Sequence, residues 1–585
     1  MEHEGPVRYL RMLTNSVIGG LAFALYLTIL VLQINPRYPL MGIPGLTVTL
    51  VLSYGFHAAA VFYALIVLRQ VLATDVISPG WISFRFLVWL CSASAGVAVL
   101  LTWGNLRDLS PFMDPEAVTR TTGGALVLTA CAGIMVALAL GHRWAGRHSS
   151  RPGAAVLAVA LMASMAGPLM LRGPGAGPPE MARWPATSPE VAGPAGEARI
   201  VMILLEGASL DLIAPAAVEG RLPNFERLLE RGASLHLATM RPTQPGPVWT
   251  AVATGKLPFR NGIRSSATYT PLASADVLEV LPDYCYSHAL VEYGFLREHV
   301  HESRDLTARP VWSLLGAQGV PVGVVNWSVT QPARDVRGYL VSDQFERRYA
   351  SLVDVEDIGV VWPRDAAPVA AAAAGETQRA ERASAQGASD DAGQLIARPC
   401  AADRVHERVA AVLDERYPSR FQAVRYECLD AAGHYYFRYA VPGAFGDVSD
   451  DELQRYGGVL PARYAAVDQM LGRVMAALRP GDLLLVVSGF GMQPMSVGKR
   501  LLERSVGNPE PSGTHEPAPD GFLFAFGTDV RPGRLTRGSV VDLVPTILYF
   551  FGLPVGWDMD GFARTDIFTP AFSAGRPITY ILTYE

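Results

Sequence analysis

The residues best placed to do chemistry follow two apolar runs in the second part of the chain. The run ARIVMILL ends at Glu206, and the run GDLLLVV leads into the segment SGFG, from Ser488 to Gly491. Ligands of open α/β sheets bind outside the carboxyl ends of the strands. A carboxylate at such a position can act as a general base or as an oxygen ligand of a metal ion. We therefore expect a site at these two strand ends and in the loops nearby.

Strand-like and helical patterns alternate around these positions. The runs VPVGVVNW and DGFLFAFG have the length of buried strands, whereas LPNFERLLERGA and PARYAAVDQMLGRVMAALRPG have helical periodicity. This alternation indicates an α/β domain with a mostly parallel sheet flanked by helices. The sequence contains no P-loop, GxGxxG, GxSxG or paired CxxC motif, so the chemistries that depend on those motifs have no support here.

The first part of the chain is apolar enough to cross a membrane. Five stretches approach or exceed the roughly 20 residues that a bilayer core requires, and none has a charge at its centre: 12–33, 46–68, 82–103, 122–141 and 154–171. Small residues recur within them and would let helices pack closely. These stretches predict an all-α membrane domain of about five helices over residues 1–172, rather than a cleaved signal peptide.

Basic residues beside the spans favour a cytoplasmic N-terminus. Six arginines flank one side of the expected domain: Arg8, Arg11, Arg69, Arg143, Arg147 and Arg151. Five flank the other side: Arg37, Arg107, Arg120, Arg172 and Arg183. By the positive-inside rule, five crossings place everything after Leu171 outside the cytoplasm. The expected location is the inner or plasma membrane, with a periplasmic C-terminal domain.

Composition and low-complexity segments add limits on class and organisation. The 585 residues are 50% hydrophobic and 18% charged with a net charge of −5, which gives no basic footprint for nucleic acid. Residues 173–197 are rich in Pro, Gly and Ala and read as a linker. Residues 365–395 read as a low-complexity insertion. Its Ala run could be helical, but a mobile surface segment is the expectation.

Cysteines are few. Cys91 and Cys131 fall in the apolar stretches, while Cys285, Cys400 and Cys428 could supply one disulfide with one cysteine left over. Their spacing does not choose the pair.

Six dispersed segments resemble the type I phosphodiesterase/nucleotide pyrophosphatase family of the alkaline phosphatase superfamily. They are LLEGASLDLIAPAAVEGRLPNFERLLERGA, WTAVATGKLPFRNGI, VGVVNWSVTQPA, LDAAGHYYFRYAVP, SGTHEPAPDGFLFAFG and DLVPTILYFFGLPVGWDMDG. The resemblance runs in the family's order over residues 199–572. It implies an alkaline-phosphatase-like domain over 198–572, followed by a tail at 573–585, with pockets built from insertions around 265–307 and 365–393.

The resemblance also implies a two-metal phosphoryl-transfer site, usually with zinc. Two cations a few Å apart stabilise both the attacking and the leaving oxygen. The ligands of the first ion are present as Asp430 and His434 in LDAAGH and as His515 in SGTHEP. One carboxylate and two imidazoles leave a fourth position open, which is typical of catalytic zinc.

The second set of family positions is degenerate. The family's SDHGM stretch is SGFGM here, so Gly489 and Phe490 replace an Asp and a His ligand. The Asp after the first strand is Glu206, which keeps an oxygen ligand or a possible general base. Pro245 stands at the position of the Ser/Thr nucleophile, and Thr243 could replace it only if the loop changed register.

Three functions remain open at this point. The first is a membrane-tethered hydrolase that acts on a phosphate ester outside the cytoplasm, with zinc or another divalent metal in one site. The second is a pseudoenzyme that keeps the fold as a binding or scaffolding module. The third is a phosphoryl-group transferase on a lipid-linked substrate, because lipoteichoic-acid synthases and phosphoethanolamine transferases have a similar layout. The expected partners are the bilayer and a phosphate-ester or lipid-linked small molecule, without nucleic acid.

Overall fold

The computed structural model describes residues 4–72, 79–144, 151–173, 196–350, 359–384, 391–506, 511–516 and 518–585. Most of the predicted linker, residues 174–195, lies outside the described residues. The chain divides into two compact units. A helical unit comprises Met1–Pro179 and Ala267–Val300, and an α/β unit comprises Glu180–Ser266 and His301–Glu585.

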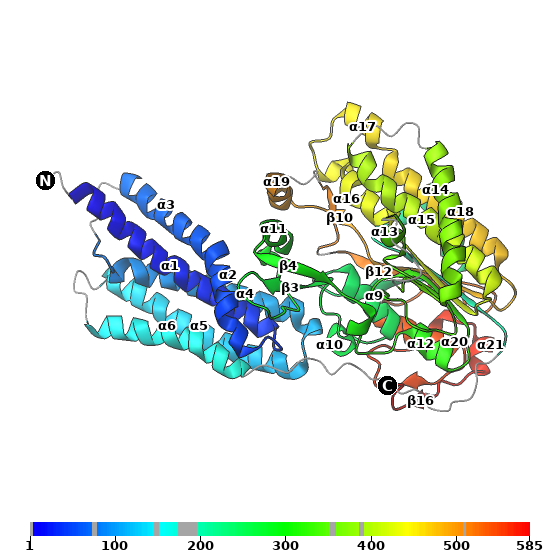
Figure 1. The fold of residues 1–585 in the computed structure, drawn as a ribbon, viewed down its shortest axis with the longest axis horizontal. Helices are drawn as coiled ribbons and strands as arrows, with labels where there is room; N and C mark the ends of the chain where they lie inside the picture. The colour runs from blue at the N-terminus through cyan, green and yellow to red at the C-terminus, as the bar shows by residue number, and fades with distance from the viewer. Residues whose placement is uncertain are drawn as a thin grey trace. The chain divides into compact units, whose positions relative to one another are not determined.

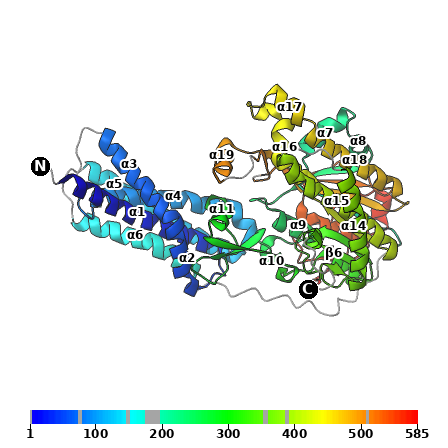
Figure 2. The same cartoon turned by 45° about the horizontal axis from the view of Figure 1, so that its top comes forward.

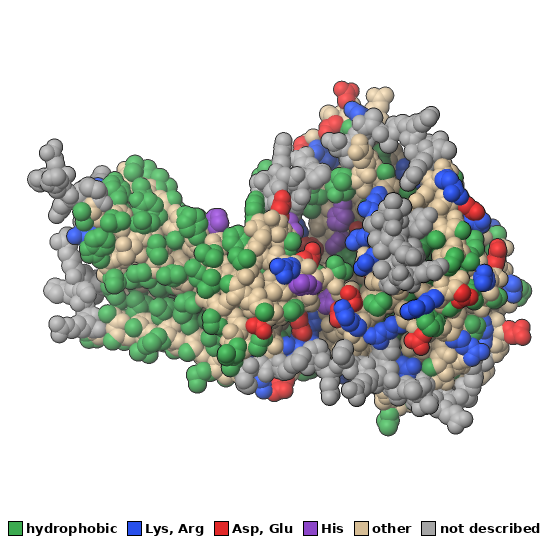
Figure 3. Space-filling view, viewed as in Figure 1, with side chains coloured by type: hydrophobic (Ala, Val, Ile, Leu, Met, Phe, Trp, Pro, Cys, Tyr) green, Lys and Arg blue, Asp and Glu red, His purple; other side chains and the backbone are tan. Residues whose placement is uncertain are grey.

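The helical unit has five helical segments long and apolar enough to span a membrane, as the sequence predicts. They cover Val7–Ile34, Leu40–Leu72, Phe84–Phe112, Pro115–Gly141 and Pro152–Arg172. The elements are α1 (Glu4–Ile34), α2 (Ile43–Leu50), a π turn (Val51–Gly55), α3 (Phe56–Leu72), α4 (Phe84–Leu109), α5 (Pro115–Trp144) and α6 (Arg151–Arg172). Hydrophobic side chains cover much of this unit's visible surface (Figure 3). A soluble protein rarely exposes so much apolar surface, which indicates integral membrane association.

Small and polar residues hold these helices together. Gly20 lies so close to the π turn that a Cβ there would be 2.5 Å from the Gly55 carbonyl oxygen. At the end of α1, Arg172 donates hydrogen bonds to the carbonyl oxygens of Leu32 at 2.8 Å and Asn35 at 2.9 Å. Arg172 thereby satisfies carbonyls that a helix end leaves without intrahelical partners.

A hairpin from the second half of the sequence belongs to the helical unit. It consists of β3 (Ala267–Pro271), α11 (Ser287–Glu292) and β4 (Leu296–Val300), with β3 and β4 antiparallel. Asn35 at the end of α1 accepts the N–H groups of Glu279 and Val280, both at 2.9 Å, and Asn105 of α4 donates to the Tyr284 hydroxyl at 3.0 Å. Most of the insertion that the sequence analysis assigned to the α/β domain therefore packs on the apolar helices.

The α/β unit is built on a ten-stranded sheet, with the order β13-β2-β12-β9-β1-β8-β5-β6-β7 and β14 beside β2. The strands are β1 (Ile200–Leu205), β2 (Ala233–Ala238), β5 (Val322–Trp327), β6 (Gly338–Ser342), β7 (Val361–Trp362), β8 (Phe421–Tyr426), β9 (Leu483–Phe490), β12 (Asp520–Phe526), β13 (Gly533–Arg534) and β14 (Gly538–Ser539). The central strands from β9 to β6 are parallel, while β12 and β7 pair antiparallel. Strands β1, β5 and β9 are buried along their whole length, as strands covered on both faces must be.

Helices flank this sheet, so the predicted fold class is confirmed. One core cluster joins α7 (Leu210–Val218), α8 (Pro223–Arg231), α14 (Ala367–Ser384), α15 (Asp391–Arg416), α16 (Cys428–Ala440) and α18 (Val459–Ala477) on one face (Figures 1 and 2). The other face carries α9 (Pro245–Thr254), α12 (Val311–Ala317) and α20 (Leu543–Phe550) (Figure 1). The smaller elements are α10 (Pro258–Asn261), α13 (Phe345–Ala350), α17 (Asp450–Tyr456), α19 (Val497–Val506), α21 (Pro570–Ala574), β10 (Gln493–Pro494), β11 (Gly513–Thr514), β15 (Val555–Gly556) and β16 (Tyr580–Ile581).

The low-complexity segment differs from its expectation. Ala367, Ala370, Ala373 and Ala374 lie on α14 and are buried in the core cluster. Alanine is the strongest helix former, and its small side chain lets the helix approach the core closely. The expectation of a mobile surface segment is therefore wrong for these residues, while residues 385–390 lie outside the described part of the chain.

Candidate metal centre

Three of the sequence-predicted ligands meet in the α/β unit. Asp430 and His434 lie one turn apart on α16, and His515 follows β11. One potential ligand atom from each of the three lies within 4.8 Å of the other two. Asp430 Oδ2 is 3.5 Å from His434 Nε2, and the two imidazole rings are 5.2 Å apart. The fold thus brings His515 to a carboxylate and an imidazole that lie far from it in the sequence.

Backbone carbonyls orient both imidazoles. His434 Nδ1 lies 3.0 Å from the Gly513 carbonyl oxygen, and His515 Nδ1 lies 3.2 Å from the Thr243 carbonyl oxygen. Because a carbonyl only accepts, each Nδ1 carries a hydrogen, and Nε2 is the ring nitrogen left to ligate a metal. Asp430 Oδ1 is buried with no hydrogen-bond partner among the described residues. This donor set fits a divalent ion such as zinc with an open position.

The triad is electrostatically coupled in its metal-free form. Burial alone would lower the pKa of His434, but the neighbouring Asp430 carboxylate raises it to about 9. Burial acts to raise the pKa of Asp430, and His434 overcomes this and lowers it. Burial lowers the pKa of His515. A divalent ion held by these residues would take the place of the proton that Asp430 stabilises on His434.

The positions where the family's other ligands are lost are filled with apolar groups. Phe490, at the end of β9, is fully buried and packs 5.0 Å from the His515 ring and 6.3 Å from the Trp249 ring. A Cβ on Gly489 would lie 2.6 Å from Val248 Cγ1. The space beside His515 is thus occupied by aromatic and aliphatic side chains, which supply no metal ligand.

Neither candidate for a side-chain nucleophile presents a hydroxyl to the triad. Pro245 begins α9 and has no hydroxyl. The Thr243 hydroxyl is buried and donates to the Met240 carbonyl oxygen at 2.9 Å. Thr243 contributes to the site through its own carbonyl, which fixes the ring of His515.

Glu206 directly follows β1 and lies beside the triad. The next residue, Gly207, has a φ of +64°, and a Cβ there would lie 2.5 Å from Asp430 Oδ1. Glu206 is buried and forms an ion pair with Arg425 of β8. Burial raises the pKa of Glu206, Arg425 opposes that shift, and Glu427 and Asp430 add to it.

Arg425 and Glu427 are site residues that the sequence analysis missed. Arg425 Nη1 contacts Glu427 Oε1 at 2.9 Å as well as Glu206. Its Nε donates to the Asn326 carbonyl oxygen at 2.7 Å, and Asn326 Nδ2 donates to Glu427 Oε2 at 3.2 Å. An arginine inside the strand FQAVRY was the available signal, because a buried charge requires a partner.

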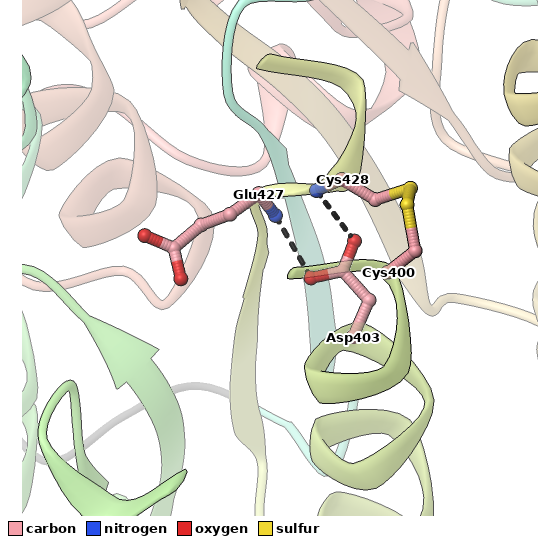
Figure 4. The surroundings of a disulfide bond; sticks show 4 residues. All are labelled: Cys400, Asp403, Glu427 and Cys428. Carbon is pink, nitrogen blue, oxygen red and sulfur yellow. Dashed lines mark hydrogen bonds between the residues drawn. A yellow bond between two sulfur atoms is a disulfide. The ribbon is translucent and has the colours of Figure 1, made fainter. Parts of the chain in front are cut away.

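The first turn of α16 is anchored where it leaves β8. Cys428 forms a disulfide with Cys400 of α15, and Asp403 accepts the N–H groups of Glu427 at 2.8 Å and Cys428 at 2.9 Å (Figure 4). The carboxylate of Asp403 satisfies N–H groups that a helix start leaves without intrahelical partners. Both supports therefore hold the helix that carries Asp430 and His434.

Comparison with known families identifies one sequence match. The model of the type I phosphodiesterase / nucleotide pyrophosphatase family matches residues 200–508, slightly more than half of the chain. Among curated proteins, none matches this chain.

Several solved structures are similar at low identity. Murine ectonucleotide pyrophosphatase/phosphodiesterase 5, inactive and in complex with AMP, has a TM-score of 0.38 and 14% identity over 64% of this chain and 100% of that chain. Wild-type alkaline phosphatase PafA has a TM-score of 0.39 and 12% identity over 65% of this chain and 100% of that chain. Phosphonoacetate hydrolase from Sinorhizobium meliloti 1021, in complex with phosphonoformate, has a TM-score of 0.32 and 14% identity over 55% and 66%. The sequence match, not these structures, carries the assignment.

Proposed function

Because this chain belongs to the type I phosphodiesterase / nucleotide pyrophosphatase family, we propose that it hydrolyses a phosphate ester with one divalent metal ion, held by Asp430, His434 and His515. The observation that carries this proposal is the convergence of the three ligand atoms, with both Nδ1 atoms already bonded to backbone carbonyls. Zinc is the ion that this donor set favours.

The division of labour follows from the contacts. When bound, a divalent ion acts as a Lewis acid toward a phosphoryl oxygen and lowers the pKa of a water. Thr243 and Gly513 hold the two imidazoles in the orientation that such an ion needs. Since Pro245 provides no hydroxyl, we infer that water rather than a side chain attacks phosphorus. The role of Glu206 as general base stays a prediction, with Arg425 fixing its position.

We further propose that the α/β unit lies outside the cytoplasm, tethered by the helical unit. The Cys400–Cys428 disulfide supports this location, because such bonds persist in oxidising compartments. The arginine distribution along the spans agrees with it. An alkaline-phosphatase reporter fused after Leu171 is expected to be active, and an inactive reporter would contradict the topology.

A second candidate function is a catalytically inactive binding module. The apolar filling at Phe490 and Gly489, together with Pro245, favours it. Hydrolysis by the purified protein separates the two functions, since a module without turnover still binds the metal.

The decisive experiment measures metal content and turnover together. The full-length protein in detergent is expected to hold near-stoichiometric zinc and to hydrolyse bis(p-nitrophenyl) phosphate. His434→Ala and His515→Ala should lose both properties, while His236→Ala on β2 is the matched control. Wild-type protein without metal would sink the one-metal site. Metal without turnover would favour the binding module.

A further inference from the structure

Two carboxylates converge beside the triad on one buried guanidinium. Glu206 Oε2 and Glu427 Oε1 both contact the same nitrogen of Arg425, Nη1. Asp430 is close enough that Arg425 helps to lower its pKa. The side chains of Arg425 and Glu206 are 6% and 5% exposed, so solvent does little to screen these charges.

Arg425 is fixed in this position from both ends. Its Nε donates to the Asn326 carbonyl oxygen at 2.7 Å, and its own carbonyl accepts from Asn326 Nδ2 at 3.1 Å. The same Nδ2 reaches Glu427 Oε2 at 3.2 Å. Asn326 has a φ of +58°, a left-handed conformation that Asn tolerates better than most residues. This reciprocal bonding leaves the guanidinium little freedom to move aside.

The remaining space for a second ion is closed. Glu206 and Glu427 surround Arg425 Nη1 as two carboxylates would surround a cation, and the guanidinium fills that position. On the side of His515, Phe490 occupies the space, and a side chain at position 489 would meet Val248 Cγ1. The residues present therefore do not fit a second metal ion.

We propose that Arg425 is the fixed cation of this site: it takes the place of a second metal ion between Glu206 and Glu427 and limits the site to one ion. This inference rests on the proposed function only for the identity of the first ion, at Asp430, His434 and His515. Arg425 acts as a positioning residue, since it holds Glu206 and Glu427 next to Asp430.

Removing the guanidinium should create a second cation site. Arg425→Gln leaves Glu206 and Glu427 facing each other without their shared cation, and oxygen ligands of this kind suit Mn2+. Glu427 is 39% exposed, which gives an added ion a path from solvent. We expect the variant to bind a second equivalent of Mn2+ that wild type does not bind, and to show a larger Mn2+-dependent rise in unfolding temperature.

The test uses the full-length protein in detergent, with bound Mn2+ counted by elemental analysis and electron paramagnetic resonance. Glu206→Gln combined with Arg425→Gln should lose the added ion. Arg473→Gln, which makes the same change at an exposed arginine paired with Glu407, is the matched control. A folded Arg425→Gln protein with a single Mn2+, or a wild type that binds two, overturns the proposal.

A folding failure is also informative. If Arg425→Gln stays unfolded even in millimolar Mn2+, Arg425→Lys tests the proposal instead. A lysine in place of the arginine is again a fixed cation, so it should restore both the fold and the binding of one ion. Failure of the lysine variant would make Arg425 a packing element and end the proposal. An added ion that depends on Glu206 but not on His434 would support the inference even if the proposed triad site failed. One ion in both wild type and Arg425→Gln would support the triad site and contradict the role of Arg425.

Discussion

The Asp430–His434–His515 triad and the Glu206–Arg425 cluster lie next to each other, yet their buried charges have different kinds of partner. In the triad, Asp430 Oδ1 has no hydrogen-bond partner among the described residues, and both imidazoles keep Nε2 for a ligand. In the cluster, an internal guanidinium already bonds to Glu206 and Glu427. Buried carboxylates need a positive partner. Arg425 is that partner in the cluster, whereas Asp430 lies against His434 and would face a divalent ion under the proposed function.

The largest effect is expected from a substitution in the triad. Asp430→Asn keeps the size of the side chain but removes its negative charge. That charge is the only one that the proposed ligand set, with its two histidines, offers a metal ion. Zinc affinity should fall by at least about 100-fold, because even indirect changes around metal ligands cost about 10–100-fold. Isothermal titration with zinc, together with turnover of bis(p-nitrophenyl) phosphate, measures the change. Unaltered affinity would remove Asp430 from the ligand set.

The next effect loosens the helix that serves both regions. Replacing Cys400 and Cys428 together by Ser removes the bond between α15 and α16, whose cysteines are 28 residues apart. Disulfides that close loops of this size typically contribute about 2–4 kcal/mol to the free energy of unfolding.

Thermal unfolding of the full-length protein, in matched detergent and without reductant, measures this contribution. The single variant Cys285→Ser is the control, because Cys285 is a buried cysteine of the helical unit outside the Cys400–Cys428 disulfide. An unfolding temperature equal to that of wild type would show that Asp403 alone secures the start of α16.

A third variant tests whether ligands can be restored at the positions that apolar groups now fill. Gly489→Asp with Phe490→His supplies two ligand types, but the new Cβ at position 489 would meet Val248 Cγ1 at 2.6 Å. Overpacking of this kind costs about 1–3 kcal/mol, so we expect lower stability and no second metal ion. Adding Val248→Ala should recover part of the stability. Binding of a second ion by the double variant would show that the apolar filling, rather than Arg425, closes the site.

The smallest effect is expected at His406 on α15, which lies near Glu427 of the cluster. His406 is fully buried, and burial lowers its pKa to about 4 despite the nearby Glu427. The folded-state pKa is thus below the unfolded value near 6.5. His406 therefore leaves stability intact above about pH 6.5 and lowers it as the pH falls toward about 4, with a slope of up to about 1.4 kcal/mol per pH unit.

His406→Gln should flatten the fall in unfolding temperature between pH 7 and pH 5, with His236→Gln as the matched control. An unchanged slope would mean that the pKa of His406 is the same in the folded and unfolded protein.

Much of the fold and part of the site were predictable from local patterns. The five apolar stretches identified the helices, and the strand runs at Glu206 and Ser488 marked ends of parallel strands. Asp430, His434 and His515 stood out through their motifs. The prediction for residues 367–374 was wrong, because a run of alanines looks the same in sequence whether its helix is exposed or buried in a core.

The sequence by itself determined which donor atoms are available, because the type of a residue fixes its ligand chemistry. It also determined that Gly489 and Phe490 supply no ligand. Only the tertiary structure decided which charges share a partner. Arg425 lies in β8 and Glu427 directly follows that strand, whereas Glu206 follows β1, so the contact of Glu206 with Arg425 depends on the pairing of β1 with β8. The same holds for residues 267–300, whose polar groups bond to α1 and α4 far away in the chain. Electrostatic and packing energies depend on distances in space, and a sequence records distances only along the chain.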